Sequence, residues 1–412
     1  NYKPEMASEI TGVSANVIEQ TAKIFADADP GMIYAGYASC KWLHGDLLQR
    51  AMLLLLALTG STGKEGGGLQ IANSPNARGL TQFGFSDVGP AFRLISSTTW
   101  DYDHADMKEL NQKIYGNDLA EKFDRYYKKS IEEDWFPDYS KNGWKMGIFA
   151  GNNGANWRAT GSTWRKTAFE ELETIVSLAP DMGVTSLYSD YVLPIAHHYE
   201  RNDLMLQSRV PYLQVLNEAV PPLGEAVDDW EANRRLAEAI SRRAKERNIK
   251  PIQDAVDGRT VRRDYTKTLE LYTMGGRVNN SKDVAQFIIN ASHGIPKISF
   301  EELSQKGIVK VEGVENTMWE KDESPYHNEI VKSVRKKLPY ETFTGRQQFY
   351  IDHEWFIEFG ETLPTFKEPL KIDEFPLRMM MGHARHGIHS TWRDDSFLLS
   401  LQRGEPDIYV NP

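Results

Sequence analysis

The stretch "IVSLAPDMGVTSLYSDYVLPIAHHYERND", residues 175–203, contains two short apolar segments, and polar residues follow each one directly. Upstream, "MGIFAGNNGANW" repeats this arrangement, with a predicted strand over 145–150 and a loop of glycine and asparagine after it. Apolar runs of this length, bounded by turn residues, are typical of strands buried inside an α/β sheet. Ligands bind beyond the carboxyl ends of such strands, so we expect a polar site there.

The flanking sequence alternates helix and strand signals, which favours an α/β fold. Apolar residues at helical spacing predict a helix within 6–29, with Ser14 as a capping residue. A short buried strand is predicted over 31–38, and a helix over 47–60 ends at Gly60.

Further along, helices are predicted over 167–175 and 230–248. The second of these has an apolar face and a face of mixed charge, as expected for a helix at the surface of a sheet. Two polar stretches, 302–315 and 349–356, are interpreted as possible strand pieces.

These patterns predict five regions along the chain. The first residue is not methionine and the last residues follow a strand-like run, so we interpret the sequence as an internal segment of a longer polypeptide. The regions are the end of an α/β domain (1–70), an aromatic-rich insertion (71–144), an α/β nucleotide-binding domain (145–250), an irregular connector (251–370) and the start of a β-barrel domain (371–412).

Composition excludes several classes of protein. The 412 residues are 40% hydrophobic, enough for a large core, and the net charge of -10 argues against nucleic acid as a partner. Cys40 is the only cysteine, so the sequence has no disulfide framework and no run that ligates an iron–sulfur cluster. The longest apolar run, from Ala51, is far shorter than the roughly 20 residues of a membrane span, so we expect no direct membrane insertion.

The loop after the strand over 145–150 is the first candidate site. Gly151 allows the backbone N–H groups to approach a ligand closely, and Asn152 and Asn153 both donate and accept hydrogen bonds. A phosphate or the edge of a heterocycle fits such a loop. A plain turn is the alternative, because asparagine and glycine are common turn residues.

Asp181 follows the next strand, with Thr185 four residues on. A carboxylate at this position can accept a pair of hydrogen bonds from a guanine-like edge with an N–H and an NH2 group. The alternative is a helix or turn cap.

The segment "HHYERND" follows the third strand and contains His197, Glu200 and Asn202. These are residue types that bind metals, but no second cluster has the spacing to complete a metal site, so no metal ligands are assigned.

The segment "GHARHGIHSTW" concentrates polar donors near the end of the chain. Its histidine spacing does not form a usual zinc pair, whereas donors for a polar heterocycle fit it better. A surface loop is the alternative. The candidate residues are His383, Arg385, His386, His389, Ser390 and Trp392.

Taken together, these stretches resemble the catalytic alpha subunits of the DMSO-reductase family of molybdenum enzymes. The resemblance covers most of the chain apart from roughly 80–140 and 255–365. Within this family, the stretches look most like the branch that contains the nitrate, selenate and chlorate reductases and the ethylbenzene and steroid side-chain dehydrogenases. The pieces that carry it are "GVSANVIEQTAKIFADADPGMIYAGYASCKWLHGD", "LLALTGSTGKEGGG", "FAGNN", "APDMGVTSLYSDYVLPIAHHYERND", "PPLGEAVDDWEANRRLAEAI" and "HARHGIHSTWRDD".

The resemblance implies doubly wound α/β domains that hold a molybdenum bis(molybdopterin guanine dinucleotide) cofactor, followed by a β-barrel. By resemblance, the Gly151–Asn153 loop binds one dinucleotide, and Asp181 with Thr185 holds a guanine. The remaining cofactor-binding residues carried over are His197, Glu200, Asn202, Asp229, His383, Arg385, His386, His389, Ser390, Thr391 and Trp392. The molybdenum ligand and a 4Fe–4S cluster are expected in the parent chain, outside these residues.

Lys41 and His44 follow a predicted strand end, where the family approaches its substrate, and are the candidate catalytic residues. By resemblance, a lysine at this position is a feature of the hydrocarbon-hydroxylating dehydrogenases. A cation there can stabilise an oxyanion. A solvated surface lysine is the alternative. We therefore expect a water-dependent hydroxylating dehydrogenase of an apolar, hydrocarbon-like substrate. A respiratory oxyanion reductase or a nitrite oxidoreductase of the same family is the alternative.

The resemblance also implies partners: an iron–sulfur beta subunit, a haem b gamma subunit and the remainder of the alpha subunit. A periplasmic location is expected, with the cytoplasm as the alternative. Two other classes compete with these interpretations. A dinucleotide-dependent dehydrogenase predicts a GxGxxG turn, which the sequence lacks. A non-catalytic scaffold of the same fold predicts a parent complex without molybdenum.

Overall fold

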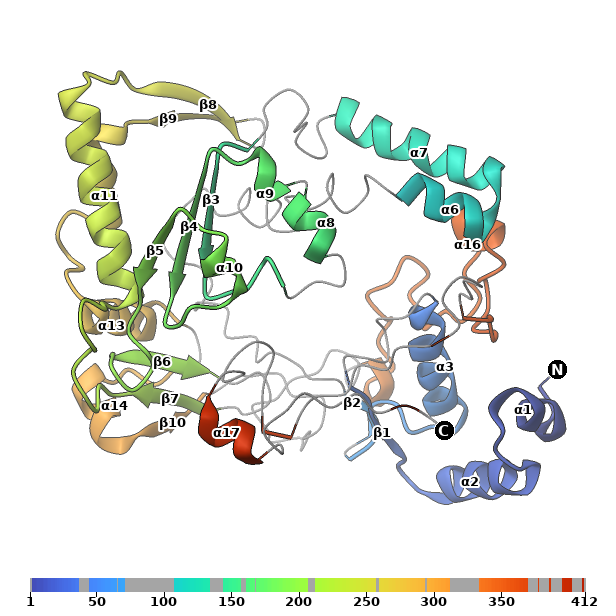
Figure 1. The fold of residues 1–412 in the computed structure, drawn as a ribbon. Coiled ribbons are helices and arrows are strands. Elements are labelled where there is room, and N and C mark those ends of the chain that lie inside the picture. The colour runs from blue at the N-terminus through green and yellow to red at the C-terminus, as the bar shows by residue number, and fades with distance from the viewer. Residues whose placement is uncertain are drawn as a thin grey trace. The chain divides into compact units, whose positions relative to one another are not determined.

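The chain forms two compact units, each built from separate stretches of sequence (Figure 1). One unit comprises Asn1–Phe83, Leu204–Val215 and Ile288–Ile372, and the other comprises Gly84–Asp203, Leu216–Phe287 and Asp373–Pro412. The computed structural model describes residues 2–36, 44–64, 66–70, 107–133, 144–156, 161–166, 168–206, 212–256, 259–292, 295–311, 333–369, 377, 385–386, 395–401 and 410.

The first unit opens with two helices where the sequence predicts one. Gly12 adopts a left-handed conformation at φ 71° and ends the first helix, and the Ser14 hydroxyl accepts from the Val17 N–H at 3.4 Å to begin the second. The predicted cap is therefore confirmed, and the predicted single helix is wrong at Gly12. The elements are α1 (Pro4–Thr11), α2 (Ala15–Asp27), β1 (Met32–Tyr34), α3 (Gly45–Leu58) and β2 (Gly68–Gln70), with β1 and β2 parallel.

The same unit contains a three-stranded sheet in the order β10–β7–β6, in which β10 and β7 are antiparallel. Its core joins β7 to the helices beside it through Leu213 and Leu303, both with no exposed surface, and Ile289. The elements are β6 (Asp203–Leu206), β7 (Tyr212–Leu216), the end of α13 (Ser281–Ala291), α14 (Phe300–Lys306), β10 (Ile308–Lys310) and α16 (Glu354–Glu358).

The second unit is organised by a parallel sheet in the order β3–β4–β5, the strands that the opening stretch predicts. Ile175 of β4 packs with Phe169 on one face, and Leu178 packs with Ala232 on the other. Helices thus cover both faces of β4, as an α/β sheet requires. The elements are β3 (Met146–Ala150), α8 (Gly161–Lys166), α9 (Ala168–Glu171), β4 (Thr174–Ala179), α10 (Val184–Leu187), β5 (Tyr191–Pro194) and α11 (Asp229–Glu246).

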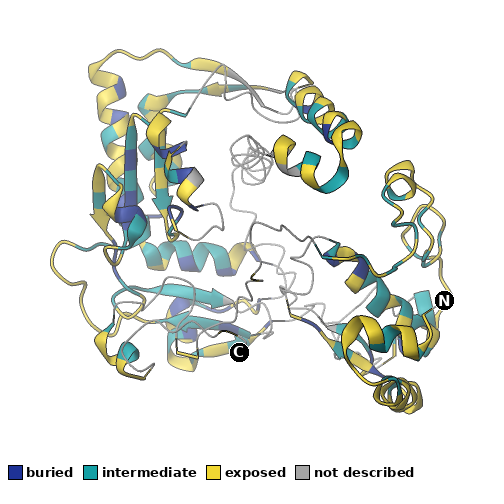
Figure 2. Cartoon of the chain, turned by 45° about the vertical axis from the view of Figure 1, so that its right-hand side comes forward, coloured by how far each residue is buried: buried dark blue, intermediate teal, exposed yellow. Residues whose placement is uncertain are grey.

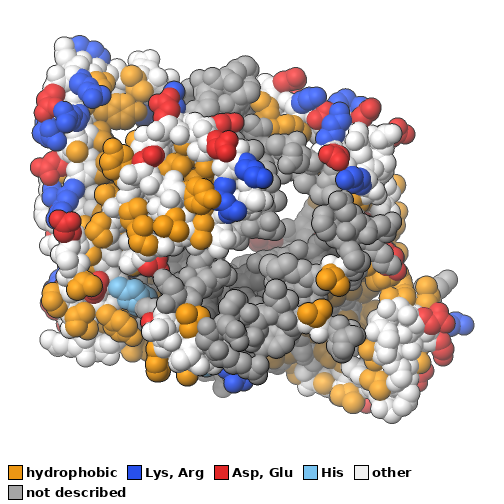
Figure 3. Space-filling model, in the orientation of Figure 1, with side chains coloured by type: hydrophobic (Ala, Val, Ile, Leu, Met, Phe, Trp, Pro, Cys, Tyr) orange, Lys and Arg blue, Asp and Glu red, His pale blue; other side chains and the backbone are white. Residues whose placement is uncertain are grey.

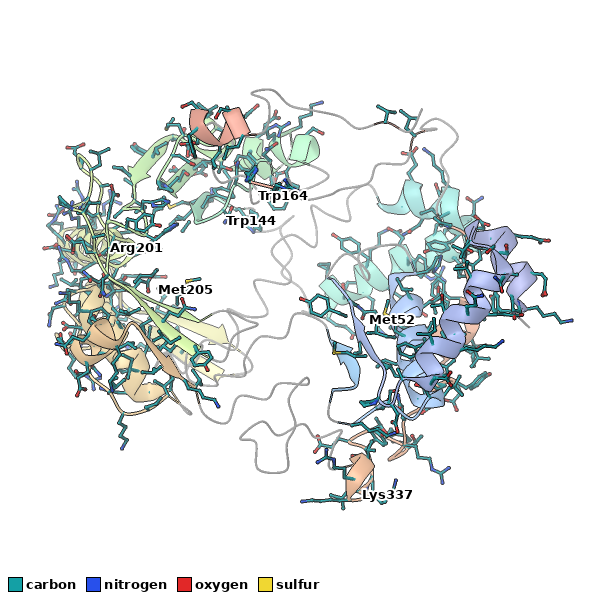
Figure 4. The ribbon with its side chains drawn as sticks, turned by 90° about the horizontal axis from the view of Figure 1, so that it is seen from below. Met52, Trp144, Trp164, Arg201, Met205 and Lys337 are labelled. Atoms are coloured by element: carbon teal, nitrogen blue, oxygen red, sulfur yellow. The ribbon has the colours of Figure 1, made fainter. Side chains whose placement is uncertain are left out.

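The buried residues of this sheet and the exposed turns of α11 are visible in Figure 2, and side chains of both charges line α11 in Figure 3. Trp144 and Trp164 approach each other with ring centroids 6.2 Å apart beside the sheet (Figure 4). The unit also contains α6 (Met107–Tyr115), α7 (Asn117–Glu132), an antiparallel hairpin of β8 (Ile252–Val256) and β9 (Arg259–Arg263), η2 (Tyr265–Lys267), α12 (Thr268–Tyr272) and α17 (Ser396–Leu401).

Other predicted elements differ from the structure. The predicted strand over 349–356 is wrong, because His353 caps α16 through its side chain and the chain turns into a helix. The helix predicted over 167–175 ends at Glu171, since β4 begins at Thr174. The connector 251–370, predicted as irregular, holds regular helices and strands. The five region boundaries and the β-barrel from residue 371 stay predictions.

Within the described ranges, no helix combines the length and the hydropathy needed to span a bilayer.

Candidate functional site

Three connections meet at one edge of the β3–β4–β5 sheet. The strands are parallel, with Ala150 paired to Leu178 and Ala179 paired to Pro194, so their carboxyl ends lie side by side. The loop after β3, the loop between β4 and α10, and the turn after β5 therefore share this edge, where ligands bind in α/β sheets. Hydrophobic side chains also lie exposed over β5 and α10 (Figure 3).

The loop after β3 is joined to the loop after β4 by Asn153. Its carboxamide oxygen Oδ1 accepts from the Thr185 backbone N–H at 2.9 Å and from the Thr185 hydroxyl at 2.7 Å. The same hydroxyl accepts from the Ala155 N–H at 3.0 Å. The sequence predicts both Asn153 and Thr185 as site residues, and the structure brings them into direct contact. Gly151 and Asn152, also predicted, are exposed at this edge, and Gly151 has a φ of 64°.

At this edge of the sheet, Gly183 lies between the Asn153 amide and the Asp181 carboxylate. A Cβ atom added to it would lie 3.4 Å from Asn153 Nδ2 and 3.7 Å from an Asp181 carboxylate oxygen. A hydrogen-bond donor and a charged acceptor thus border a space that the absence of a side chain leaves open. The Asp181 carboxylate is exposed, whereas its backbone oxygen accepts from the Ser186 hydroxyl at 3.3 Å.

The turn after β5 lies close enough to these loops for charges to interact. The pKa of His197 is lowered because burial disfavours its charged form and His198 adds a like charge, while the carboxylates of Glu200 and Asp181 oppose the shift. The His197 and His198 rings have centroids 3.7 Å apart. Asp181 therefore influences a residue of the third loop electrostatically.

Other predicted residues of this turn are held by partners within the chain. Glu200 accepts from the His197 N–H at 2.8 Å. Asn202 accepts from the Glu218 N–H and donates to the Glu218 carboxylate, both at 3.3 Å. In the described part of the chain, no three histidine, cysteine or acidic residues are grouped to hold a metal ion.

Asp229, the first residue of α11, forms an ion pair with Arg201, which also lies 3.6 Å from Asp203 (Figure 4). Arg201 Nε is buried and has no hydrogen-bond partner. Arg201 is absent from the set that the sequence predicts, although it stands directly after Glu200 in the same polar segment. Its position beside predicted residues is the signal that could have identified it.

Gly183 and Arg165 were also missed. The Arg165 guanidinium donates to the Ala155 carbonyl at 2.5 Å and lies 5.8 Å from the Tyr188 ring centroid. This places Arg165 beside the β3 loop. The position of Gly183 between Asp181 and Thr185 could have indicated it from the sequence. No sequence pattern indicates that Arg165 on α8 contacts this loop.

His44 belongs to the other unit. It precedes α3 with a φ of 65°, and its Nδ1 hydrogen-bonds to the Glu361 carboxylate; their side chains are 18% and 13% exposed. Six residues further along the chain, in α3, Arg50 donates to the carbonyls of Phe349, Glu361 and Thr362 at 3.4, 2.7 and 2.9 Å. His44 is therefore fixed to the 349–362 segment. Lys41 lies outside the described residues.

Two residues of the predicted C-terminal cluster are described. Arg385 and His386 lie in an exposed turn. The others fall outside the described ranges: His383, His389, Ser390, Thr391 and Trp392.

Comparisons with known proteins agree with this architecture. The structure resembles acetylene hydratase from Pelobacter acetylenicus, with a TM-score of 0.57 and 17% identity over 97% of this chain and 50% of that one. This similarity concerns the fold.

Curated relatives match along the whole chain. It is 34% identical to the perchlorate reductase subunit alpha of Dechloromonas aromatica, over 99% of this chain and 44% of the relative. It is 32% identical to the respiratory nitrate reductase subunit alpha of Haloferax mediterranei, over 100% of this chain and 43% of the relative. It is 31% identical to the dimethylsulfide dehydrogenase subunit alpha of Rhodovulum sulfidophilum, over 100% of this chain and 46% of that relative. The chain thus spans less than half the length of these relatives.

A family model described as molybdopterin oxidoreductase matches residues 9–239, a range that includes the β3–β4–β5 sheet and its three loops. The chain therefore belongs to the molybdopterin oxidoreductases, as a member of the DMSO-reductase family of catalytic alpha subunits.

Proposed function

We propose that the chain is part of the catalytic alpha subunit of a molybdenum oxidoreductase and that the edge of the β3–β4–β5 sheet holds one guanine dinucleotide of its cofactor. The observation that carries this proposal is the space at Gly183, which Asn153 Nδ2 and the Asp181 carboxylate border from opposite loops. Guanine presents an acceptor beside two donors along one edge. An amide donor next to a carboxylate complements that pattern.

The residues at this edge fit such a cofactor. Gly151 is exposed, and no atom lies within 4 Å of the position that a Cβ would take there, so a pyrophosphate can approach its backbone. Asn152 and Asn153 supply neutral donors, and Asp181 supplies an acceptor for guanine. Neutral hydrogen-bonding groups suit a large buried ligand, because each polar group taken out of water needs a partner.

The remaining assignments from the family are part of the same proposal. His197, Glu200, Asn202 and Asp229 would line the groove through their turn and through the start of α11. His389, Ser390 and Thr391 would contact a pterin, and the other C-terminal residues assigned to the cofactor are His383, Arg385, His386 and Trp392. When bound, the molybdenum pterin supplies two-electron redox chemistry with transfer of an oxygen atom.

We propose an oxyanion of the nitrate, chlorate or perchlorate kind as the substrate. The names of the perchlorate and nitrate reductase relatives support this choice, and a chlorate reductase subunit alpha from Ideonella dechloratans, 28% identical over the chain, supports it further. The expected hydrocarbon dehydrogenase is not supported over this alternative. It depended on Lys41, which lies outside the described residues.

The partners and location proposed are those of such an enzyme. The relatives are alpha subunits by name, which supports an assembly with other subunits. We propose an iron–sulfur beta subunit, a haem b gamma subunit, a 4Fe–4S cluster elsewhere in the alpha subunit and a periplasmic location.

Asp181→Asn tests the guanine assignment. An asparagine turns one of its two acceptor positions into a donor, which opposes the guanine donors, so we expect at least a roughly tenfold loss of bound guanine nucleotide. The measurement is the guanine nucleotide released by acid from the purified intact enzyme, together with its molybdenum content. Asp27→Asn, on the exposed side of α2, is the matched control. Normal nucleotide content in Asp181→Asn would show that the assignment is wrong.

A further inference from the structure

Thr185 connects the two loops that carry the proposed nucleotide site. It is 2% exposed and lies at the second position of α10, a helix whose N-cap residue is Gly183. Gly183 has no side chain to accept from the first N–H groups of that helix. Asn153, which is 32 residues away in the sequence, supplies the missing acceptor through its Oδ1.

The hydrogen-bonding groups of Thr185 are directed within the chain. Its hydroxyl hydrogen is donated to Asn153, and its hydroxyl oxygen accepts from the N–H of Ala155, which has no exposed surface. Its backbone carbonyl accepts from the Ser189 hydroxyl at 2.8 Å. A threonine hydroxyl has one hydrogen to donate, and that hydrogen is already used. Thr185 therefore has no donor left for a ligand.

The two bonds from Thr185 fix the orientation of the Asn153 carboxamide. Because Oδ1 accepts both of them, Nδ2 points the other way, to within 3.4 Å of the position a Cβ of Gly183 would take. That is the space which Asp181 borders from the other side. The donor half of the proposed site thus depends on the Thr185 hydroxyl.

We propose that Thr185 is a positioning residue that acts on the nucleotide through Asn153 and Ala155, in place of the direct guanine contact that the family resemblance implies. It holds the β3 loop in its binding conformation and keeps the Asn153 amide group directed at the ligand. This inference rests on the proposed function, because it concerns how the same edge recognises a guanine dinucleotide.

The test compares Thr185→Val, which removes the hydroxyl and keeps the shape, with Thr185→Ser, which restores the hydroxyl. Ser189→Ala is the matched control, since its hydroxyl bonds to the Thr185 carbonyl and not to the β3 loop. Thr185→Ala replaces the valine variant if that variant fails to accumulate. Two quantities are measured in the intact enzyme: amide hydrogen exchange of residues 151–156 by mass spectrometry, and the rate at which guanine nucleotide is lost.

Thr185→Val leaves the buried Ala155 N–H without its acceptor, so we expect exchange at this residue and nucleotide loss each to rise by roughly tenfold. Thr185→Ser and Ser189→Ala are expected to match the native enzyme in both. Unchanged exchange in Thr185→Val, or faster exchange with unchanged nucleotide loss, would overturn the positioning role. A native enzyme that contains no guanine nucleotide would instead overturn the proposed function on which it rests.

Discussion

Gly183→Ala is the most selective perturbation of the proposed nucleotide site. Gly183 has a φ of -64° and a ψ of 174°, a conformation that alanine adopts without strain. The added methyl carbon would lie 3.4 Å from Asn153 Nδ2 and 3.7 Å from the Asp181 carboxylate, which are ordinary van der Waals distances. The fold is therefore expected to tolerate the change, while the methyl group occupies the space between donor and acceptor.

The magnitude follows from the interactions that the methyl group blocks. A hydrogen bond to a charged group contributes about 1.5–3 kcal/mol, so losing the contact with Asp181 alone weakens guanine binding by roughly 10- to 150-fold. Loss of the Asn153 contact adds to this. Because no protein atom has to move, the substitution itself is expected to change the free energy of unfolding by less than about 0.5 kcal/mol, so a fall in the thermal unfolding midpoint would report the lost ligand.

The assay measures guanine nucleotide and molybdenum per chain in the intact enzyme, alongside thermal unfolding. Gly36→Ala is the matched control, since no atom lies within 4 Å of its added Cβ. If Gly183→Ala kept its full nucleotide content, the space at Gly183 would not be occupied by the ligand. Equal losses in both variants would point to a general effect of the substitution.

Two further predictions concern stability. The pKa of Glu231 is lowered from 4.5 to about 2 because Arg234 and Arg235 donate hydrogen bonds to its carboxylate. The stabilisation from this pairing is complete above pH 4.5 and is lost as the pH falls toward 2, so Glu231→Gln should lose less stability over that range than the native protein or Glu246→Gln. An identical pH profile would refute the pairing. Leu213→Ala, at a side chain with no exposed surface, should lower the free energy of unfolding by about 2–5 kcal/mol in urea titrations, whereas Leu223→Ala, 81% exposed, should change it by less than about 0.5 kcal/mol.

Much of the α/β unit could be predicted from the sequence, because its strands are short apolar runs with clear ends. The strands predicted over 145–150, 175–181 and 189–194 are confirmed within a residue or two, as β3, β4 and β5. The Ser14 cap is confirmed for the same reason, since its signal lies within a few residues of the helix it begins. Local patterns of this kind need no tertiary information.

The failures occur where short-range chemistry competes with propensity. The aromatic run ending in "HEWF" has the composition of a strand, but the His353 side chain accepts from the Trp355 N–H and starts α16 instead. A glycine two residues before Ser14 ends α1, and the helical spacing on either side concealed that break.

The candidate site was predicted as separate loops and not as a network. The polar ends of the strands indicated Asn153 in one loop and Asp181 with Thr185 in the next, without a contact between the two loops. The contact between Asn153 and Thr185 joins residues 32 apart and depends on the pairing of β3 with β4, which no local pattern specifies. For the same reason the sequence assigned Thr185 to the ligand, whereas the structure gives its hydroxyl two partners in the β3 loop.

Metal and nucleotide analysis of the unmodified intact enzyme would show whether the parent complex carries the proposed cofactor. We expect molybdenum in the purified enzyme and two guanine nucleotides released by acid for each molybdenum atom. An enzyme that folds and assembles without molybdenum or guanine nucleotide would contradict it, and would leave the chain as a scaffold that retains the fold without the cofactor.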